Sequence, residues 1–65
     1  MTNTNKLKAK IIEKGYNQEY IAEKLGVSVS AINYKINNKR HFNAEEMFIL
    51  CDILEIENPK DYFFA

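Results

Sequence analysis

The sequence predicts an all-α protein of four to five short helices. Apolar residues recur three and four positions apart in several stretches, which is the spacing of one helix face. Gly15 and Gly26 each follow such a stretch, where a helix commonly ends in the left-handed conformation that Gly adopts without steric cost. The 65 residues predict one small domain, because a chain this short buries only about 60% of its unfolded surface and cannot support two cores.

Composition narrows the class of protein. An apolar content of 46%, with two Gly and one Pro, fits a folded domain rather than a disordered tail. Cys51 is the only cysteine, so an internal disulfide and a thiolate metal cluster are excluded, which suits a reducing compartment. The sequence contains neither an apolar run of about 18 residues nor a signal segment. We therefore expect a cytoplasmic protein without a membrane partner.

Charge is divided unevenly along the chain although the total is zero. Met1 to His41 carries eight basic and three acidic residues, whereas Phe42 to Ala65 carries one lysine and six acidic residues. A polyanion would attract the first part and repel the second. The alternative is that solvated charges are simply spread unequally.

The first helix is expected from Lys6 to Lys14, after a frayed segment from Met1 to Asn5. Leu7 and Ile11 share its buried face. A separate row of lysines would either contact phosphates or remain solvated, and it consists of Lys6, Lys10 and Lys14. Gly15 ends the helix.

The stretch from Gln18 to Asn37 predicts two helices hinged at Gly26. In the first of them, Ile21 and Leu25 stand four apart and form a narrow stripe that faces inward. Asn17 precedes this helix in the N-cap position. The free backbone N–H groups and the positive dipole end there suit an anion, although an ordinary cap explains the same residues.

The second of the two helices is predicted to begin at Val29, with Ser28 as its N-cap. Ile32 and Ile36 mark its buried side. The opposite face carries neutral groups that both donate and accept hydrogen bonds, from Ser30, Asn33, Tyr34 and Asn37. A helix, a short turn containing Gly and a polar second helix form the outline of the helix-turn-helix, whose second helix lies in the major groove. The sequence therefore predicts double-stranded DNA as the partner.

The segment GYNQEYIAEKLGVSVSAINYKINNKR resembles the Cro/repressor class of helix-turn-helix proteins from temperate phages and bacteria, the XRE-like, lambda-repressor-like fold. The similarity covers Gly15 to Arg40 closely and the following helix more loosely. It implies that Gln18 contacts the DNA backbone or an edge base and that Ala22 lets the two helices approach closely. It also implies that the residues at the groove are Ser28, Val29, Ser30, Asn33 and Asn37. The run KINNKR before an acidic helix is similar to small phage regulators in particular.

Two positions depart from that family's pattern. Many members have an apolar residue where Lys35 stands and Gly where Asn38 stands. Asn tolerates the left-handed conformation, so the second change is mild. The first indicates that Ile36 takes the anchoring role while Lys35 points toward a phosphate or solvent. The rotation of the helix is thereby left open, and so is the choice of base contact among Asn33, Tyr34 and Asn37.

The loop after this helix is basic. Lys39 and Arg40 are expected to lie over the sugar-phosphate chain and to neutralise phosphates. His41 is interpreted as an ordinary surface histidine, because no second His and no Cys stands at ligand spacing. We expect neither a metal nor a cofactor.

A fourth helix is predicted within Phe42 to Leu54, where Asn43 and Glu46 match a capping box. Its residues are apolar on more than one side, which is more than a small domain normally hides, and Cys51 is interpreted as a small buried apolar residue. Asn58 and Pro59 open a last short helix. The aromatic residues that follow either fold back on the core or cover a partner subunit in a homodimer, and they are Tyr62, Phe63 and Phe64.

The expected function is that of a sequence-specific DNA-binding transcription regulator, a Cro-type repressor. Base contacts are expected from Ser30, Asn33 and Asn37, and phosphate contacts from Gln18, Lys35, Lys39 and Arg40. The alternative is a protein-interaction module on the same fold, such as an antirepressor or antitoxin, because a fold does not fix a function. An enzyme is not indicated, since the sequence shows no paired acid and base, no phosphate loop and no ligand cluster.

Overall fold

Five α-helices follow one another along the chain, and the computed structural model describes residues 1–65. The predicted all-α class is confirmed, since the structure contains no strand. The helices are α1 (Thr4–Glu13), α2 (Gln18–Leu25), α3 (Val29–Ile36), α4 (Ala44–Ile53) and α5 (Pro59–Phe63).

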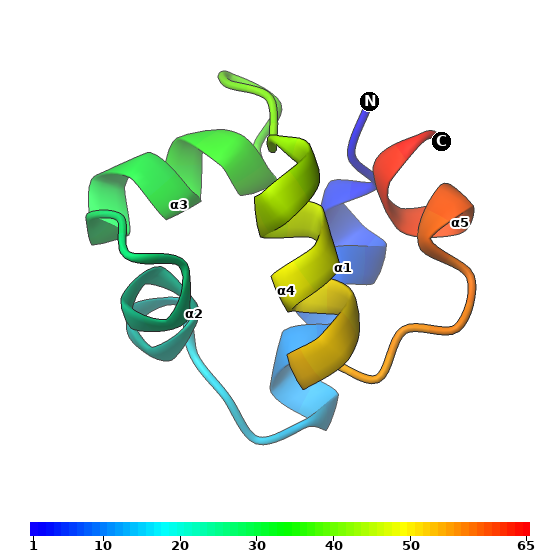
Figure 1. Cartoon of the computed structure of the whole chain (residues 1–65), viewed down its shortest axis with the longest axis horizontal. Helices are drawn as coiled ribbons and strands as arrows, with labels where there is room; N and C mark the ends of the chain where they lie inside the picture. Colours follow the sequence, from blue (N-terminus) through cyan, green and yellow to red (C-terminus); the bar gives the residue numbers. More distant parts are fainter.

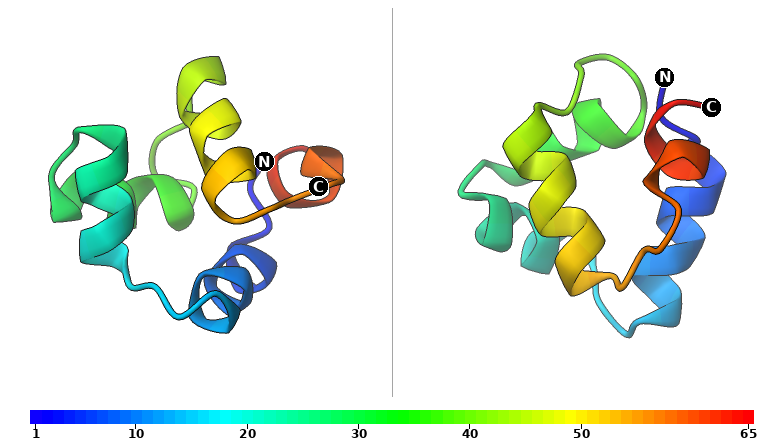
Figure 2. Two further views of the ribbon diagram at one scale, coloured as in Figure 1. Left: turned by 60° about the horizontal axis from the view of Figure 1, so that its bottom comes forward. Right: turned by 45° about the vertical axis from the view of Figure 1, so that its right-hand side comes forward.

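Helices α2 and α3 lie together at one side of the molecule, and α5 lies at the other side (Figure 1). Figure 2 shows the same separation from two further directions, with α4 and α1 between the two sides. α2 packs on α3 and α4, while α1 packs on α3 and α5. The buried side chains form one cluster made of Leu7, Ile11, Ile21, Ala22, Ile32, Ile36, Phe42, Leu50, Leu54, Ile56, Tyr62 and Phe63.

Local signals set most helix ends. The predicted N-caps Asn17, Ser28 and Asn43 are confirmed, because each side chain accepts a backbone N–H in the first turn of its helix. Asn43 and Glu46 form the complete capping box. Gly15 and Gly26 have φ of 80° and 70°, the left-handed conformation expected where α1 and α2 end.

The prediction of a frayed segment from Met1 to Asn5 is wrong. α1 already begins at Thr4, because the Asn3 side chain accepts the backbone N–H of Lys6 at 3.2 Å and caps the helix. Thr2 is buried. The backbone N–H of Asn3 donates to the carbonyl of Tyr62 at 2.7 Å, so this segment is fastened to α5. No sequence signal near Met1 indicates a partner about sixty positions away.

The aromatic residues of the C-terminal helix divide between the core and the surface. Tyr62 and Phe63 are only 5% and 3% exposed and fold back on the core. There the Phe63 and Phe42 rings pack edge to face, with their centroids 5.6 Å apart. Phe64 is 63% exposed. A partner subunit covering all three residues is therefore excluded, because two of them already pack against their own chain.

The start of α5 differs from the prediction in one detail. Pro59 occupies the first turn as expected, but the Asn58 side chain accepts no backbone N–H. Its amide instead donates to the Asp61 carboxylate. The cap position is therefore filled by the expected residue without the expected hydrogen bond.

The excess of apolar residues on α4 is confirmed. Leu50 and Leu54, next to the helix end, are fully buried, whereas Phe48 on the outer side is 76% exposed. Cys51 packs half-buried against the core, and burial raises the pKa of its thiol. None of the helices combines the length and apolarity needed to span a bilayer.

Candidate nucleic-acid interface

Helix α3 presents one polar face to the surroundings. Ile32 and Ile36 have no exposed surface, while Ser30, Asn33 and Tyr34 on the opposite side are exposed. The buried and polar sides are those that the apolar spacing predicted. α3 forms an outer edge of the molecule, at the upper left of Figure 1, so no other helix covers its polar face. Val29, at the first turn, is exposed as well.

A pair of side-chain amides connects the two helices of the motif. The Asn33 amide donates to the Gln18 side-chain carbonyl at 3.4 Å, so the first residue of α2 supports the middle of α3. One side-chain N–H and the side-chain oxygen of Asn33 remain free, as does the Gln18 side-chain NH2 group. A free N–H beside a free carbonyl is the pattern that pairs bidentately with adenine in the major groove.

Asn37 is arranged differently from Asn33. It stands at the C-cap of α3, and its side-chain amide donates back to the carbonyl of Asn33 at 2.9 Å. The residue is half-buried. Like Asn33, it has used one of its two side-chain N–H groups, so the two residues differ in exposure rather than in free groups: Asn33 is exposed, whereas Asn37 is not fully accessible. Of the candidates that the sequence left open, Asn33 is the better suited to a bidentate base contact.

The basic loop after α3 is ordered by Tyr34. The backbone N–H groups of Lys39 and Arg40 both donate to the carbonyl of Tyr34, at 2.8 and 3.3 Å. The Arg40 guanidinium lies 5.4 Å from the centre of the Tyr34 ring, a cation–π contact. Both basic side chains are exposed and have no acidic partner. The loop therefore holds two unpaired cations beside the polar face.

The expectation that Lys35 points toward a phosphate or solvent is wrong. Its ammonium group pairs with the Glu46 carboxylate, and the two side chains are only 14% and 8% exposed. The other carboxylate oxygen of Glu46 accepts the backbone N–H of Asn43. Lys35 turns inward because this partner on α4 lies within reach, and its charge is used to fasten α3 to α4.

The lysine row of α1 is also neutralised within the chain. Lys6 pairs with Asp61 at 3.8 Å and Lys14 with Glu55 at 3.5 Å, both across to the acidic part of the sequence. Lys10 pairs with Glu13 at 3.0 Å, and this hydrogen bond raises the pKa of the lysine. The basic residues without an acidic partner in the first 41 positions are Lys8, Lys24, Lys39 and Arg40.

His41 is exposed, and no group of three or more His, Cys, Asp or Glu side chains gathers where it could hold a metal ion.

Sequence reasoning missed two contacts that organise the polar face, the Gln18–Asn33 amide pair and the Lys35–Glu46 ion pair. Neither has a local signature, because the partners lie 15 and 11 positions apart on different helices.

Comparison with known proteins identifies the arrangement. A family model described as helix-turn-helix matches residues 7–57, from α1 to just beyond α4. The comparisons with curated proteins and with solved structures give no match. The matched range contains the two helices of the motif, the loop that follows α3 and the α4 helix that α3 is fastened to.

Proposed function

Because the chain belongs to the Cro/XRE-like helix-turn-helix family, a family of DNA-binding transcription regulators, we propose that it binds a specific operator with α3 in the major groove and represses transcription. The observation that carries this proposal is the exposed polar face of α3 with Ile32 and Ile36 fully buried behind it. A face of this kind is free to enter a groove of about 12 Å width, which admits one α-helix.

Sequence preference would come mainly from Asn33. Its free N–H and oxygen match the N6 and N7 groups of adenine, and a bidentate pair of this kind is worth about 1–3 kcal/mol against a wrong base. The Ser30 hydroxyl would either donate a hydrogen bond to a base edge or accept one from it, and Val29 would pack on a thymine methyl. Asn37 would contribute less, because it is half-buried and one of its side-chain N–H groups already donates to the carbonyl of Asn33.

Affinity would come from the residues at the two ends of the polar face. Lys39 and Arg40 would neutralise phosphates from the loop, and Gln18 would donate its free amide to the backbone at the start of α2. Counterion release then makes binding weaken steeply as salt rises. Lys35 is left out of this set, because Glu46 already takes its charge.

Repression by occlusion of the polymerase, and an origin among small phage regulators, are inferred from the family resemblance.

A homodimer would double the contacts with DNA and place two half-sites about one helical turn, roughly 34 Å, apart. Phe48 and Phe64 supply the exposed apolar side chains for such a contact, in place of the buried Tyr62 and Phe63.

The deciding experiment is selection of binding sites from random duplexes at physiological salt, followed by titration of the recovered sequence with the wild-type protein and Asn33→Ala. We expect the variant to lose about 1–3 kcal/mol on the recovered site, with relaxed preference at one base pair. Asn5→Ala is the matched control, because Asn5 is an exposed asparagine on α1 with no side-chain hydrogen bond. It should bind as the wild type does.

The proposal fails if the wild-type protein recovers no sequence, or if Asn33→Ala binds the recovered site unchanged. Selective binding to another protein with no sequence preference for DNA would instead favour the interaction module, in which the helix-turn-helix is inherited architecture.

A further inference from the structure

The Asn38 side chain fastens the N-terminal segment to the end of α3. Its oxygen accepts the backbone N–H of Thr2 at 2.8 Å, and its nitrogen donates to the carbonyl of the same residue at 2.9 Å. The nitrogen also lies 3.3 Å from the Thr4 hydroxyl. An amide that pairs with both the backbone N–H and the backbone carbonyl of one residue fixes the direction of that residue as well as its distance.

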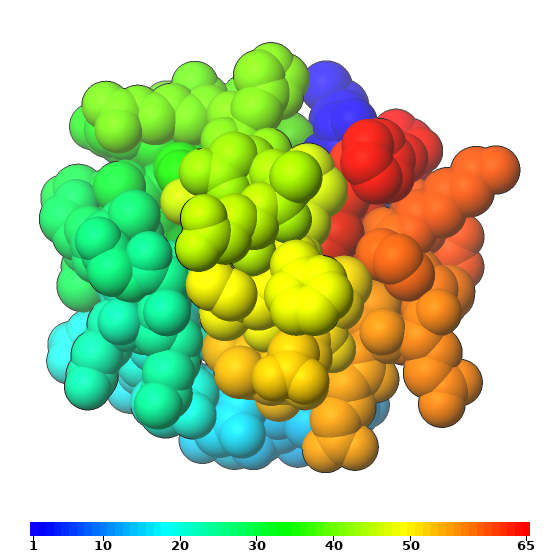
Figure 3. Space-filling model, in the orientation of Figure 1, coloured from blue at the N-terminus to red at the C-terminus, as the bar shows by residue number.

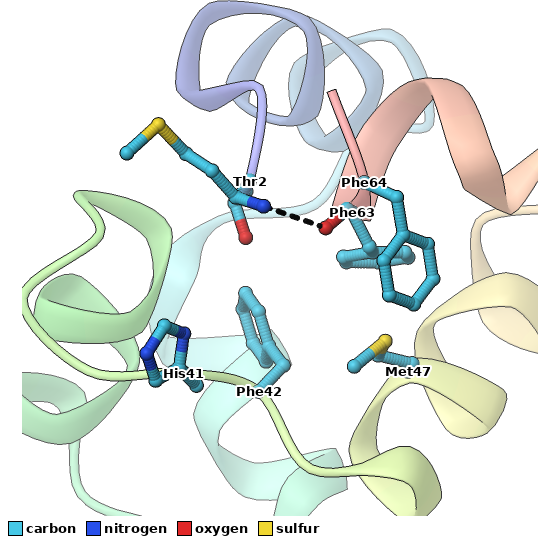
Figure 4. A pocket seen from close by; sticks show the side chains of 7 residues that line it. Thr2, His41, Phe42, Met47, Phe63 and Phe64 are labelled. Carbon is cyan, nitrogen blue, oxygen red and sulfur yellow. Dashed lines mark hydrogen bonds between the residues drawn. The ribbon is translucent and has the colours of Figure 1, made fainter.

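A second contact holds α3 directly. The Thr4 hydroxyl donates to the carbonyl of Ile36 at 2.6 Å, which satisfies one of the orphan carbonyls at the end of α3. In Figure 3 the blue N-terminal atoms lie between the green residues that follow α3 and the red C-terminal residues. Figure 4 shows Thr2 across from Phe63, with Phe42 below them between His41 and Met47. The end of α3 is thus fastened to a segment that is itself fastened to α5.

The three hydrogen bonds between the Asn38 side chain and residues Thr2 and Thr4, here called the clamp, are not required by the backbone turn. Asn38 has φ of 65°, a conformation that glycine adopts more readily, so glycine would satisfy the turn and lose all three side-chain hydrogen bonds. The bonds span 34 to 36 positions and hold a helix of only eight residues. They act on the end next to Lys39 and Arg40.

We propose that Asn38 is a positioning residue for DNA recognition, which acts through Thr2 and Thr4 to fix where the end of α3 and the loop of Lys39 and Arg40 lie. The inference rests on the proposed function. Without the clamp, the apolar contacts of Ile32 and Ile36 still hold α3 on the core. The loop and the last turn would then sample several positions, and each contact with DNA would have to order them first.

The test is Asn38→Gly, with Glu55→Gly as the matched control. Glu55 also has a positive φ, of 53°, just after α4, but it lies outside the clamp and forms only an exposed ion pair with Lys14. Circular dichroism establishes that each variant is folded at the assay temperature. We expect Asn38→Gly to weaken binding to the selected operator about tenfold while binding to random duplex changes by less than about twofold, and Glu55→Gly to change neither.

A second measurement does not involve DNA. Amide hydrogen exchange at Asn37 and Lys39 should be faster in Asn38→Gly by roughly tenfold, while exchange in α2 stays unchanged. Asn38→Asp keeps the acceptor for the Thr2 N–H but sets a carboxylate oxygen opposite the Thr2 carbonyl, so exchange at Lys39 should again be faster than in the wild type. Because its negative charge would by itself weaken DNA binding, this variant is judged by hydrogen exchange alone. It serves as the test variant if Asn38→Gly does not fold.

The outcomes separate the two proposals. If the wild-type protein shows no sequence preference, the proposed function is wrong. The hydrogen-exchange rates then test by themselves whether Asn38 holds the end of α3 in place. Wild-type operator affinity in a folded Asn38→Gly variant, or unchanged exchange at Lys39, overturns the positioning role of Asn38 even where operator binding itself is established.

Discussion

Replacing Lys35 by methionine tests whether the inward ion pair fixes the rotation of α3. The substitution keeps the aliphatic stem and removes the ammonium group. Glu46 would then keep a carboxylate in a site where its side chain is 8% exposed, with the backbone N–H of Asn43 as its remaining partner. A buried charge that loses its counter-charge keeps the desolvation cost without the compensating attraction.

The expected loss follows from the burial of the two side chains. Breaking a fully buried pair from one side costs about 3–5 kcal/mol. Lys35 remains 14% exposed and the carboxylate keeps a hydrogen bond, so we expect about 2 kcal/mol for Lys35→Met. For a domain of this size that loss lowers the melting temperature by roughly 8–16 °C. It is a large share of a total stability of about 3–10 kcal/mol.

The assay is urea and thermal unfolding followed by circular dichroism, in a double-mutant cycle with Glu46→Gln. Glutamine at this position retains the capping-box geometry, so the cycle isolates the charge pair from the cap. The double variant has no charge to bury and should recover most of the loss. Lys6→Met is the matched control, because the Lys6–Asp61 pair is about half exposed and should cost roughly 0–1 kcal/mol.

The reasoning would be refuted by a Lys35→Met variant within about 0.5 kcal/mol of the wild type, the range of ordinary surface substitutions. It would also be refuted if the two single losses simply added in the double variant, since contacting partners of a buried pair must couple.

Three further predictions concern the surface. Neutralising Lys39 or Arg40 with glutamine should reduce the slope of log affinity against log salt by about 1 each, whereas Lys35→Met should leave the slope unchanged; filter binding between 50 and 200 mM salt measures both. If a second copy covers the exposed aromatic side chains, the double variant Phe48→Ser, Phe64→Ser should be monomeric at concentrations where sedimentation shows the wild type to be a dimer, and a monomeric wild type would exclude this interface. Because burial raises the pKa of Cys51, its thiol should remain protonated at neutral pH and react with iodoacetamide more slowly in the folded protein than in urea; equal rates would contradict this.

What could be predicted from the sequence depends on how far apart the interacting residues stand. The caps at Asn17, Ser28 and Asn43 and the left-handed Gly26 act within four positions, so their residue types alone set the helix ends. The burial of Ile32 follows in the same way, from the period of a single helix. The five helices and the polar face of α3 were therefore predictable without knowledge of how the helices pack.

The contacts that could not be predicted are all non-local and polar. The sequence places Lys35 outside because Ile36 takes the anchoring role beside it. The inward position of Lys35 requires Glu46 on another helix to supply a charge. The order of the N-terminal segment likewise requires Asn38 and Tyr62, which come close to it only after folding. A polar side chain has no preferred direction until its partner is placed, so composition and periodicity say little about it.

These non-local contacts meet at the C-terminal half of α3, and this location bears on recognition. The apolar spacing alone allows the helix to rotate by a fraction of a turn around Ile32 and Ile36. The ion pair between Lys35 and Glu46 restrains this rotation on one side of the helix. The hydrogen bond from the Thr4 hydroxyl to the carbonyl of Ile36 restrains it at the helix end. The position of Asn33 in a groove is then decided by side chains that need not touch DNA at all. Variants at Lys35 or Asn38 should therefore alter which base pair is preferred before they abolish binding, and site selection with each folded variant would show this directly.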